Sequence, residues 1–86
     1  MPEHKNITAQ AIYELQKQGF SILECRRTKN SGLIITVDFG GEPKNFLFSA
    51  RKKVRKESWL RRAKLLSLDG FIGFDPANRF ISFYFC

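Results

Sequence analysis

The stretch LIITVDFGGEPKNFLF, residues 33–48, decides the fold class of this chain. Apolar side chains alternate at its start, where Leu33, Ile35 and Val37 interleave with Ile34, Thr36 and Asp38. A period of two predicts a strand with one apolar face toward a helix and one partly solvated face. The Gly-Gly-Glu-Pro sequence at 40–43 predicts a reversal, because glycine accepts a positive φ and proline presets a turn. Antiparallel strands at 33–39 and 45–48 are therefore expected.

The N-terminal side of this hairpin predicts a helix and another strand. Thr8 can cap the N-terminus of a helix at 8–17, and Gly19 can take the left-handed backbone conformation that ends such a helix. Ile7 and Ile12 are spaced as a hydrophobic staple across its start. A strand at 20–26 follows, and the Lys-Asn-Ser-Gly sequence at 29–32 provides its reversal into the next strand. The three strands form an antiparallel meander.

The C-terminal side predicts a second helix and a closing hairpin. A helix at about 56–67 places four apolar residues on one side: Trp59, Leu60, Ala63 and Leu66. The preceding residues 50–55 form either a separate first turn or an extended arm. Asp69 and Gly70 end the helix, and FIGFDPANRFISFYF at 71–85 predicts a hairpin around 75–78.

Together these elements give the order α-β-β-β-α-β-β. The 86 residues, 43 % of them hydrophobic, suffice for one small domain with a modest core. We therefore expect a single α+β domain over 1–86, with a flexible N-terminus at 1–6. Both helices are expected to cover one face of an antiparallel sheet.

The net charge of the chain is concentrated in residues 51–64, called the basic segment below. The chain has 15 basic and 8 acidic residues, a formal charge of +7, and the basic segment alone carries +7 because Glu57 is its only acid. Its bases are Arg51, Lys52, Lys53, Arg55, Lys56, Arg61, Arg62 and Lys64. Such a concentration indicates a site for an anionic partner. Arginine is frequent in it, which favours bidentate contacts to phosphate.

Nucleic acid is the partner that this pattern favours, with duplexes preferred over single strands. The predicted contacts are Arg51, Lys52, Lys53, Arg55, Lys56, Arg61 and Arg62, with Arg26, Arg27 and Lys29 as a second cluster near the first reversal. Two alternatives stay open: an acidic surface of a larger protein, and a solvated helix face. A solvated face normally mixes charges of both signs, which the basic segment does not do.

The element order and the sequence Lys52-Lys53-Val54-Arg55-Lys56 at the start of the second helix resemble the double-stranded-RNA-binding domain. The resemblance implies that these bases grip phosphates across a groove, while the first helix and the loop after the first strand touch the minor grooves. The helix sequence SWLRRAKLL and the added C-terminal hairpin depart from that family. The resemblance therefore concerns topology.

The sequence offers little for catalysis or for a cofactor, and none is expected. His4 is the only histidine, and Cys25 has no histidine nearby in the sequence to activate it. Two cysteines and one histidine so far apart do not predict a metal site. Without a long apolar run or a signal peptide, we expect a non-enzymatic cytoplasmic protein without membrane contact, in which Cys25 and Cys86 are free thiols.

The aromatic residues near the C-terminus have two interpretations. Eight aromatic residues could form a base-stacking platform on the sheet: Phe46, Phe48, Phe71, Phe74, Phe80, Phe83, Tyr84 and Phe85. Packing in the core is the more common role of such residues. The last strand, within RFISFYFC at 79–86, is apolar on both faces. It must be either central in the sheet or an edge that pairs with a second copy, and a homodimer through this hairpin is expected.

Overall fold

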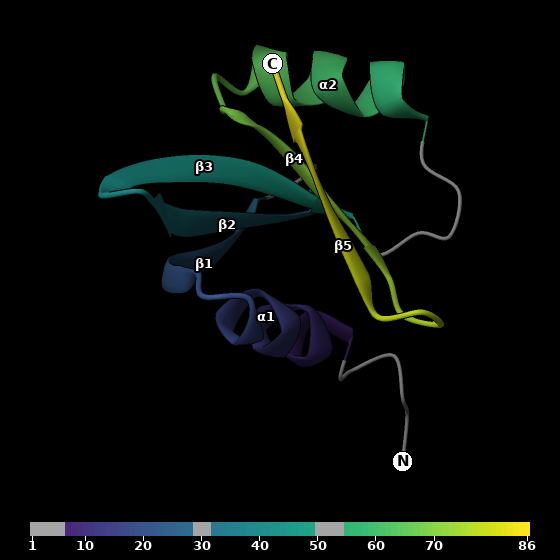
Figure 1. Ribbon diagram of the computed structural model, residues 1–86. Coiled ribbons are helices and arrows are strands. Elements are labelled where there is room, and N and C mark those ends of the chain that lie inside the picture. Colours follow the sequence, from purple (N-terminus) through teal and green to yellow (C-terminus); the bar gives the residue numbers. More distant parts are fainter. Residues whose placement is uncertain (1–6, 29–31, 50–54) are drawn as a thin grey trace.

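The computed structural model describes residues 7–28, 32–49 and 55–86. Its elements are α1 (Ile7–Lys17), β1 (Ser21–Thr28), β2 (Gly32–Phe39), β3 (Glu42–Ser49), α2 (Lys56–Leu65), β4 (Gly70–Asp75) and β5 (Phe80–Phe85). The strands form one open sheet in the order β1-β2-β3-β4-β5, with α1 and α2 on its two sides (Figure 1). The predicted α+β class and the order α-β-β-β-α-β-β are confirmed.

The sheet is mixed, and this corrects the prediction of an antiparallel sheet. Three of the four neighbouring pairs are antiparallel, but β3 and β4 run parallel, with Phe46 opposite Gly70 and Phe48 opposite Ile72. Parallel neighbours need a crossover connection, and α2 is that crossover. Because a crossover helix must lie on a face of the sheet, α2 is fixed above β3, β4 and β5.

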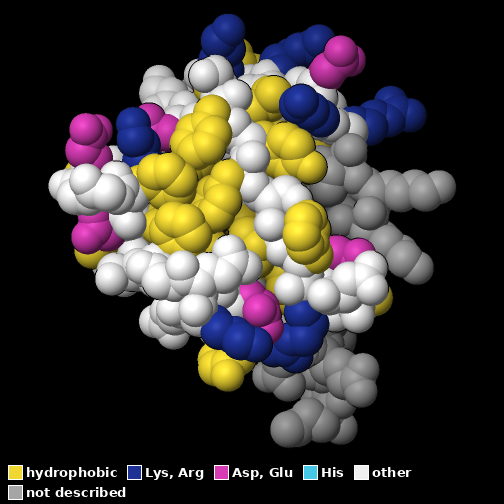
Figure 2. Space-filling view, viewed as in Figure 1, with side chains coloured by type: hydrophobic (Ala, Val, Ile, Leu, Met, Phe, Trp, Pro, Cys, Tyr) yellow, Lys and Arg dark blue, Asp and Glu magenta, His cyan; other side chains and the backbone are white. Residues whose placement is uncertain are grey.

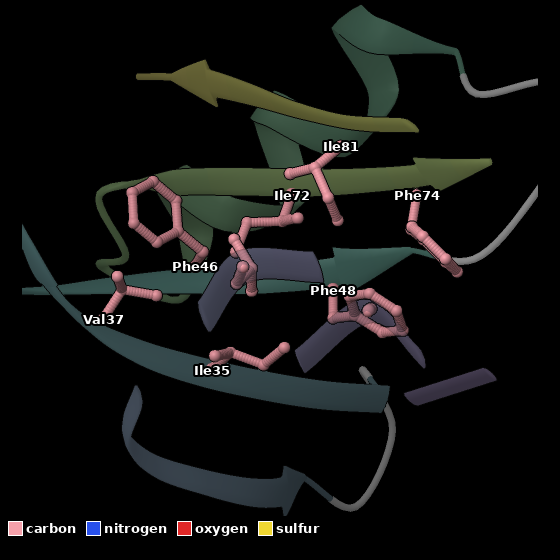
Figure 3. Packing of buried hydrophobic residues seen from close by; sticks show 9 residues of the cluster. Ile35, Val37, Phe46, Phe48, Ile72, Phe74 and Ile81 are labelled. Atoms are coloured by element: carbon pink, nitrogen blue, oxygen red, sulfur yellow. The ribbon is translucent and has the colours of Figure 1, made fainter. Parts of the chain in front are cut away.

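The two helices cover opposite faces, whereas the sequence predicted both on one face. Ala11 and Leu15 of α1 pack on the first face, together with Ile35, Val37, Phe46, Phe48, Ile72, Phe74 and Ile81 (Figure 3). Ala63 of α2 packs on the second face, together with Ile34, Leu47, Leu68 and Phe71. The sheet therefore buries both of its faces, because β2, β3 and β4 carry apolar residues at successive positions.

Helix α2 ends two residues earlier than predicted, at residue 65 instead of 67. Leu66, expected in the core, is 37 % exposed, while Leu68 is buried. The helix ends at Leu65, and Ser67 takes a positive φ of 59°. The Leu68 N–H donates to the Ala63 carbonyl at 2.8 Å, which turns the chain back and places the Leu68 side chain in the core.

Most of the eight aromatic residues pack in the core of the domain, and this is the more common of their two expected roles. Phe46, Phe71 and Phe74 are fully buried, and Tyr84 stacks on Phe71 with ring centroids 4.5 Å apart. Phe80 and Phe85, both on the edge strand β5, remain exposed. The edge position decides between the two alternatives for the last strand: β5 is not central.

Replacement of Trp59 by Ala tests the predicted core face of α2. The Trp59 ring lies 6.0 Å from the ring of Phe71 and packs against the buried residues of the second face. We expect a loss of about 3 kcal/mol in the free energy of unfolding, measured by urea denaturation. Leu65→Ala is the matched control, because Leu65 is on the same helix but 80 % exposed, and its loss should stay below about 0.5 kcal/mol. If Trp59→Ala keeps the parent stability and loses ligand binding, Trp59 is a contact residue.

Candidate nucleic-acid interface

Helix α2 carries the described part of the basic segment. It starts after Arg55, which has extended backbone angles and whose carbonyl accepts a hydrogen bond from the Trp59 N–H at 3.0 Å. Glu57 lies in the first turn, and Arg62 and Lys64 lie in the last turn. This placement of charges complements the helix dipole, so the bases at the C-terminal end also support the helix.

Three of the bases lie together at the start of α2. Arg55, Lys56 and Arg61 line a hollow of about 630 Å³ at the start of the helix, together with Glu57 and Ser58. Lys and Arg side chains gather around the position of α2, at the top of Figure 2. Three bases therefore converge on one open concave surface, next in the chain to Arg51, Lys52 and Lys53.

Two of the bases are held by aromatic rings. The Arg62 guanidinium carbon lies 4.8 Å from the centroid of the Trp59 ring, and Lys56 Nζ lies 5.7 Å from that of Tyr84. Cation–π contacts orient a positive group without neutralising its charge. Arg62 and Lys56 therefore remain available to an anion.

The acids that form ion pairs do so away from α2. Within the described ranges, the ion pairs are Arg26–Glu24 at 3.7 Å, Lys44–Glu42 at 3.7 Å and Arg79–Glu14 at 2.8 Å. None of the five bases at 55–64 forms an ion pair with an acid in these ranges.

Three other acids of the described residues accept hydrogen bonds from backbone N–H groups. Asp38 accepts a hydrogen bond from the Gly41 N–H, Asp69 from the Asn45 N–H, and Asp75 from the Ala77 N–H. These carboxylates are tied to the backbone by their own structural contacts. Glu57 is the one described acid on α2, and no described acid forms an ion pair with a base at 55–64.

The second predicted cluster is not joined to α2. Arg26 and Arg27 are exposed on β1, at the sheet edge opposite to β5. Arg26 pairs in register with Ile34, and Arg27 with Leu33, so successive side chains point to opposite faces. Arg26 also contacts Glu24, which partly neutralises it. The two arginines are a separate surface feature, and Lys29 lies outside the described residues, as do Arg51, Lys52 and Lys53.

The two cysteines are free and exposed. Partial desolvation by neighbouring groups, and to a lesser extent the charge of Glu24, raises the pKa of the Cys25 thiol, so this thiol stays protonated at neutral pH. The Cys86 sulfur lies 3.8 Å from the Leu60 carbonyl oxygen. His4 lies outside the described residues, and no group of three metal-ligating side chains occurs among the described ones. In the same part of the chain, neither helix is long and apolar enough to cross a membrane.

The sequence did not predict a groove between α2 and the end of β5. This groove, of about 400 Å³, is lined by Glu57, Leu60, Arg61, Lys64, Phe85 and Cys86. Its lining joins a flank of α2 to the last two residues of the chain, which only the tertiary structure brings together. The one signal in the sequence is the apolar C-terminus.

Comparisons of the chain with protein-family models, with curated proteins and with solved structures gave no match.

Proposed function

We propose that the protein is a non-enzymatic, cytoplasmic domain that binds nucleic acid, with the basic segment contacting phosphates. The observation that carries the proposal is the unneutralised charge of α2: its bases have no ion pair within the described ranges, while the pairing acids lie elsewhere. A polyanion supplies the missing negative charge. Free thiols at Cys25 and Cys86 fit a reducing compartment.

The hollow at the start of α2 supports phosphate as the group that is bound. Arg55 and Arg61 each present a planar donor group that can take two phosphate oxygens, and Lys56 adds a point charge. Contacts of this kind release counterions and carry no sequence information. Binding of about micromolar strength without sequence preference follows, with duplexes preferred because their phosphate density is higher.

An acidic protein surface is the second candidate partner, and one observation favours it. Leu65 is 80 % exposed on the outer side of α2, one turn from Arg61. An exposed leucine beside arginine fits a protein interface with an apolar centre and a charged rim. The apolar side chain of Leu65 cannot contact a phosphate through a charge or a hydrogen bond, so phosphate binding does not explain its exposure.

A mobility-shift assay with duplex DNA, duplex RNA and single strands tests the proposal and separates these partners. With about five phosphate contacts, raising the salt concentration from about 50 mM to about 200 mM should weaken duplex binding by about 10²- to 10³-fold. An apolar protein interface would hold much better over the same range. A protein that binds none of these nucleic acids at the lower salt concentration contradicts the proposal.

The homodimer expected through the C-terminal hairpin does not depend on nucleic-acid binding. The observations that support it concern the edge strand β5.

A further inference from the structure

The two edges of the sheet differ in how they are protected. β1 has a register irregularity between Ile22 and Glu24 and carries exposed charges at Glu24, Arg26 and Arg27. Bulges and charges are the usual means by which a sheet edge avoids pairing with another chain. β5, with the sequence FISFYF, has neither: it pairs with β4 in unbroken register and holds no charged residue or proline. In the described part of the chain, one edge of the sheet is therefore protected and the other has no neighbouring strand.

The open edge presents backbone groups from three residues. The Cys86 N–H donates to the Asp69 carbonyl at 3.0 Å, which makes this pair hydrogen-bonded. In an antiparallel ladder, hydrogen-bonded and non-hydrogen-bonded pairs alternate. The N–H and C=O groups of Tyr84 and Ser82 therefore face β4, and those of Ile81, Phe83 and Phe85 face outward.

The side chains around this edge are apolar and partly uncovered. Phe80 is 64 % exposed and Phe85 is 50 % exposed. Figure 2, in which β5 faces the viewer, shows hydrophobic side chains across the middle of this surface. Phe83 and Phe85 continue a ring cluster with Phe39 and Phe46, at centroid distances of 5.3 to 5.5 Å. Water therefore meets an aromatic surface alongside unpaired backbone groups.

We propose that β5 pairs antiparallel with β5 of a second copy, about a two-fold axis at Phe83. This register pairs all three outward residues: Phe83 with its own counterpart, and Ile81 with Phe85. Six backbone hydrogen bonds form, and the two sheets join into one. An isologous two-fold contact of this kind closes on itself and stops at the dimer.

The same register gives Phe80 a place to bind. Phe80 lies opposite Cys86 of the second copy, on the face of the sheet that α2 covers, since it alternates in phase with Tyr84. Cys86 is part of the groove of about 400 Å³ that Leu60 and Phe85 also line. The exposed Phe80 ring of each copy therefore enters the groove of the other. This match between an exposed ring and an open groove selects a second copy as the occupant of the edge.

The dimer places both α2 helices on one side of the continuous sheet, because the two-fold axis is perpendicular to it. The bases of the two α2 helices then share a face, so one nucleic-acid molecule can contact both. Dimer formation does not require nucleic acid. The interface is small, because each copy contributes one six-residue strand edge and two phenylalanines. Its buried area is at the low end of the range for stable interfaces, so we expect a Kd of about 10 µM.

Sedimentation velocity of the full chain under reducing conditions, up to about 100 µM, measures the equilibrium, and we expect mostly dimer at the upper end. Phe80→Lys should raise the Kd at least about tenfold, because it replaces the apolar ring by a positive charge beside Arg61 and Lys64. Leu23→Lys is the matched control: Leu23 is 55 % exposed on β1, and its replacement should leave the Kd unchanged. A parent chain that is monomeric throughout, or a dimer lost only with Leu23→Lys, overturns the proposal.

A disulfide test fixes the register even if Phe80→Lys disturbs folding. Residues 80 and 86 of the two copies form a non-hydrogen-bonded pair with Cα atoms about 4.5 Å apart, within the range of a disulfide. Phe80→Cys combined with Cys25→Ser should therefore oxidise to a covalent dimer. Adding Cys86→Ser should abolish that dimer. Cross-linking that persists without Cys86 shows a different register and rejects this one.

Discussion

Replacement of Arg51, Lys52, Lys53 and Lys56 by Gln should lower the affinity for duplex nucleic acid about a thousandfold at about 0.15 M salt. The magnitude follows from counterion release, since four phosphate contacts contribute about 3.6 to the slope of log affinity against log salt. The slope itself should fall by the same amount. Fluorescence anisotropy with a labelled duplex over a salt series measures both quantities. Thermal stability should stay close to that of the parent, because Lys56 is exposed and charged side chains at a surface contribute little to stability.

A matched pair of double variants separates position from net charge. Lys56→Gln with Arg61→Gln removes two bases from the hollow at the start of α2, and affinity should fall about thirtyfold. Lys17→Gln with Lys44→Gln removes the same charge from α1 and β3 and should change affinity by less than about threefold. Equal losses in the two doubles would mean that overall charge, and not the basic segment, determines binding.

Replacement of Gly70 by Ala should unfold the protein or lower its melting temperature by about 15 to 30 °C, equivalent to roughly 3 to 5 kcal/mol. A Cβ atom on Gly70 would collide with the backbone carbonyl oxygen of Tyr84 and lie 2.9 Å from the Phe85 Cα. Both contacts are with backbone of β5, which cannot rotate away. Phe46 and Phe85 are the register partners on either side of Gly70, and their rings meet at 5.5 Å. Glycine here lets β5 approach β4 closely.

Gly73→Ala is the control for this prediction, because Gly73 lies on the same strand. A Cβ atom there would be 3.6 Å from Tyr84 Cε2, an ordinary van der Waals distance. Calorimetry should show a change within about 1 kcal/mol for Gly73→Ala, since alanine also restricts the unfolded chain. If both variants are equally stable, the close approach of β5 at Gly70 does not hold in solution.

The sequence allowed much of the candidate site to be located, but not its shape. The charge excess of residues 51–64 is a local property, so it could be read directly. Glu24 and Glu42 pair with bases two positions away on their own strands, so these ion pairs are local too. The pairing of Glu14 on α1 with Arg79 depends on which elements meet. Glu14 and Arg79 are 65 positions apart and still join at 2.8 Å. The groove at Phe85 and Cys86 depends on a similar long-range meeting.

The type and order of the elements could be predicted from the sequence, because these depend on local chemistry. Alternation along 33–38 determined a strand, Gly40 and Gly41 a reversal, and the spacing of Trp59 and Ala63 a helix. Three features became visible in the three-dimensional fold alone: β4 joins β3 in parallel, α1 and α2 cover opposite faces, and β5 is an edge. Strand alternation is the same whether the neighbour is parallel or antiparallel, so it cannot select the partner. That choice depends on burying both faces of β2, β3 and β4 at once, which is a property of the whole chain.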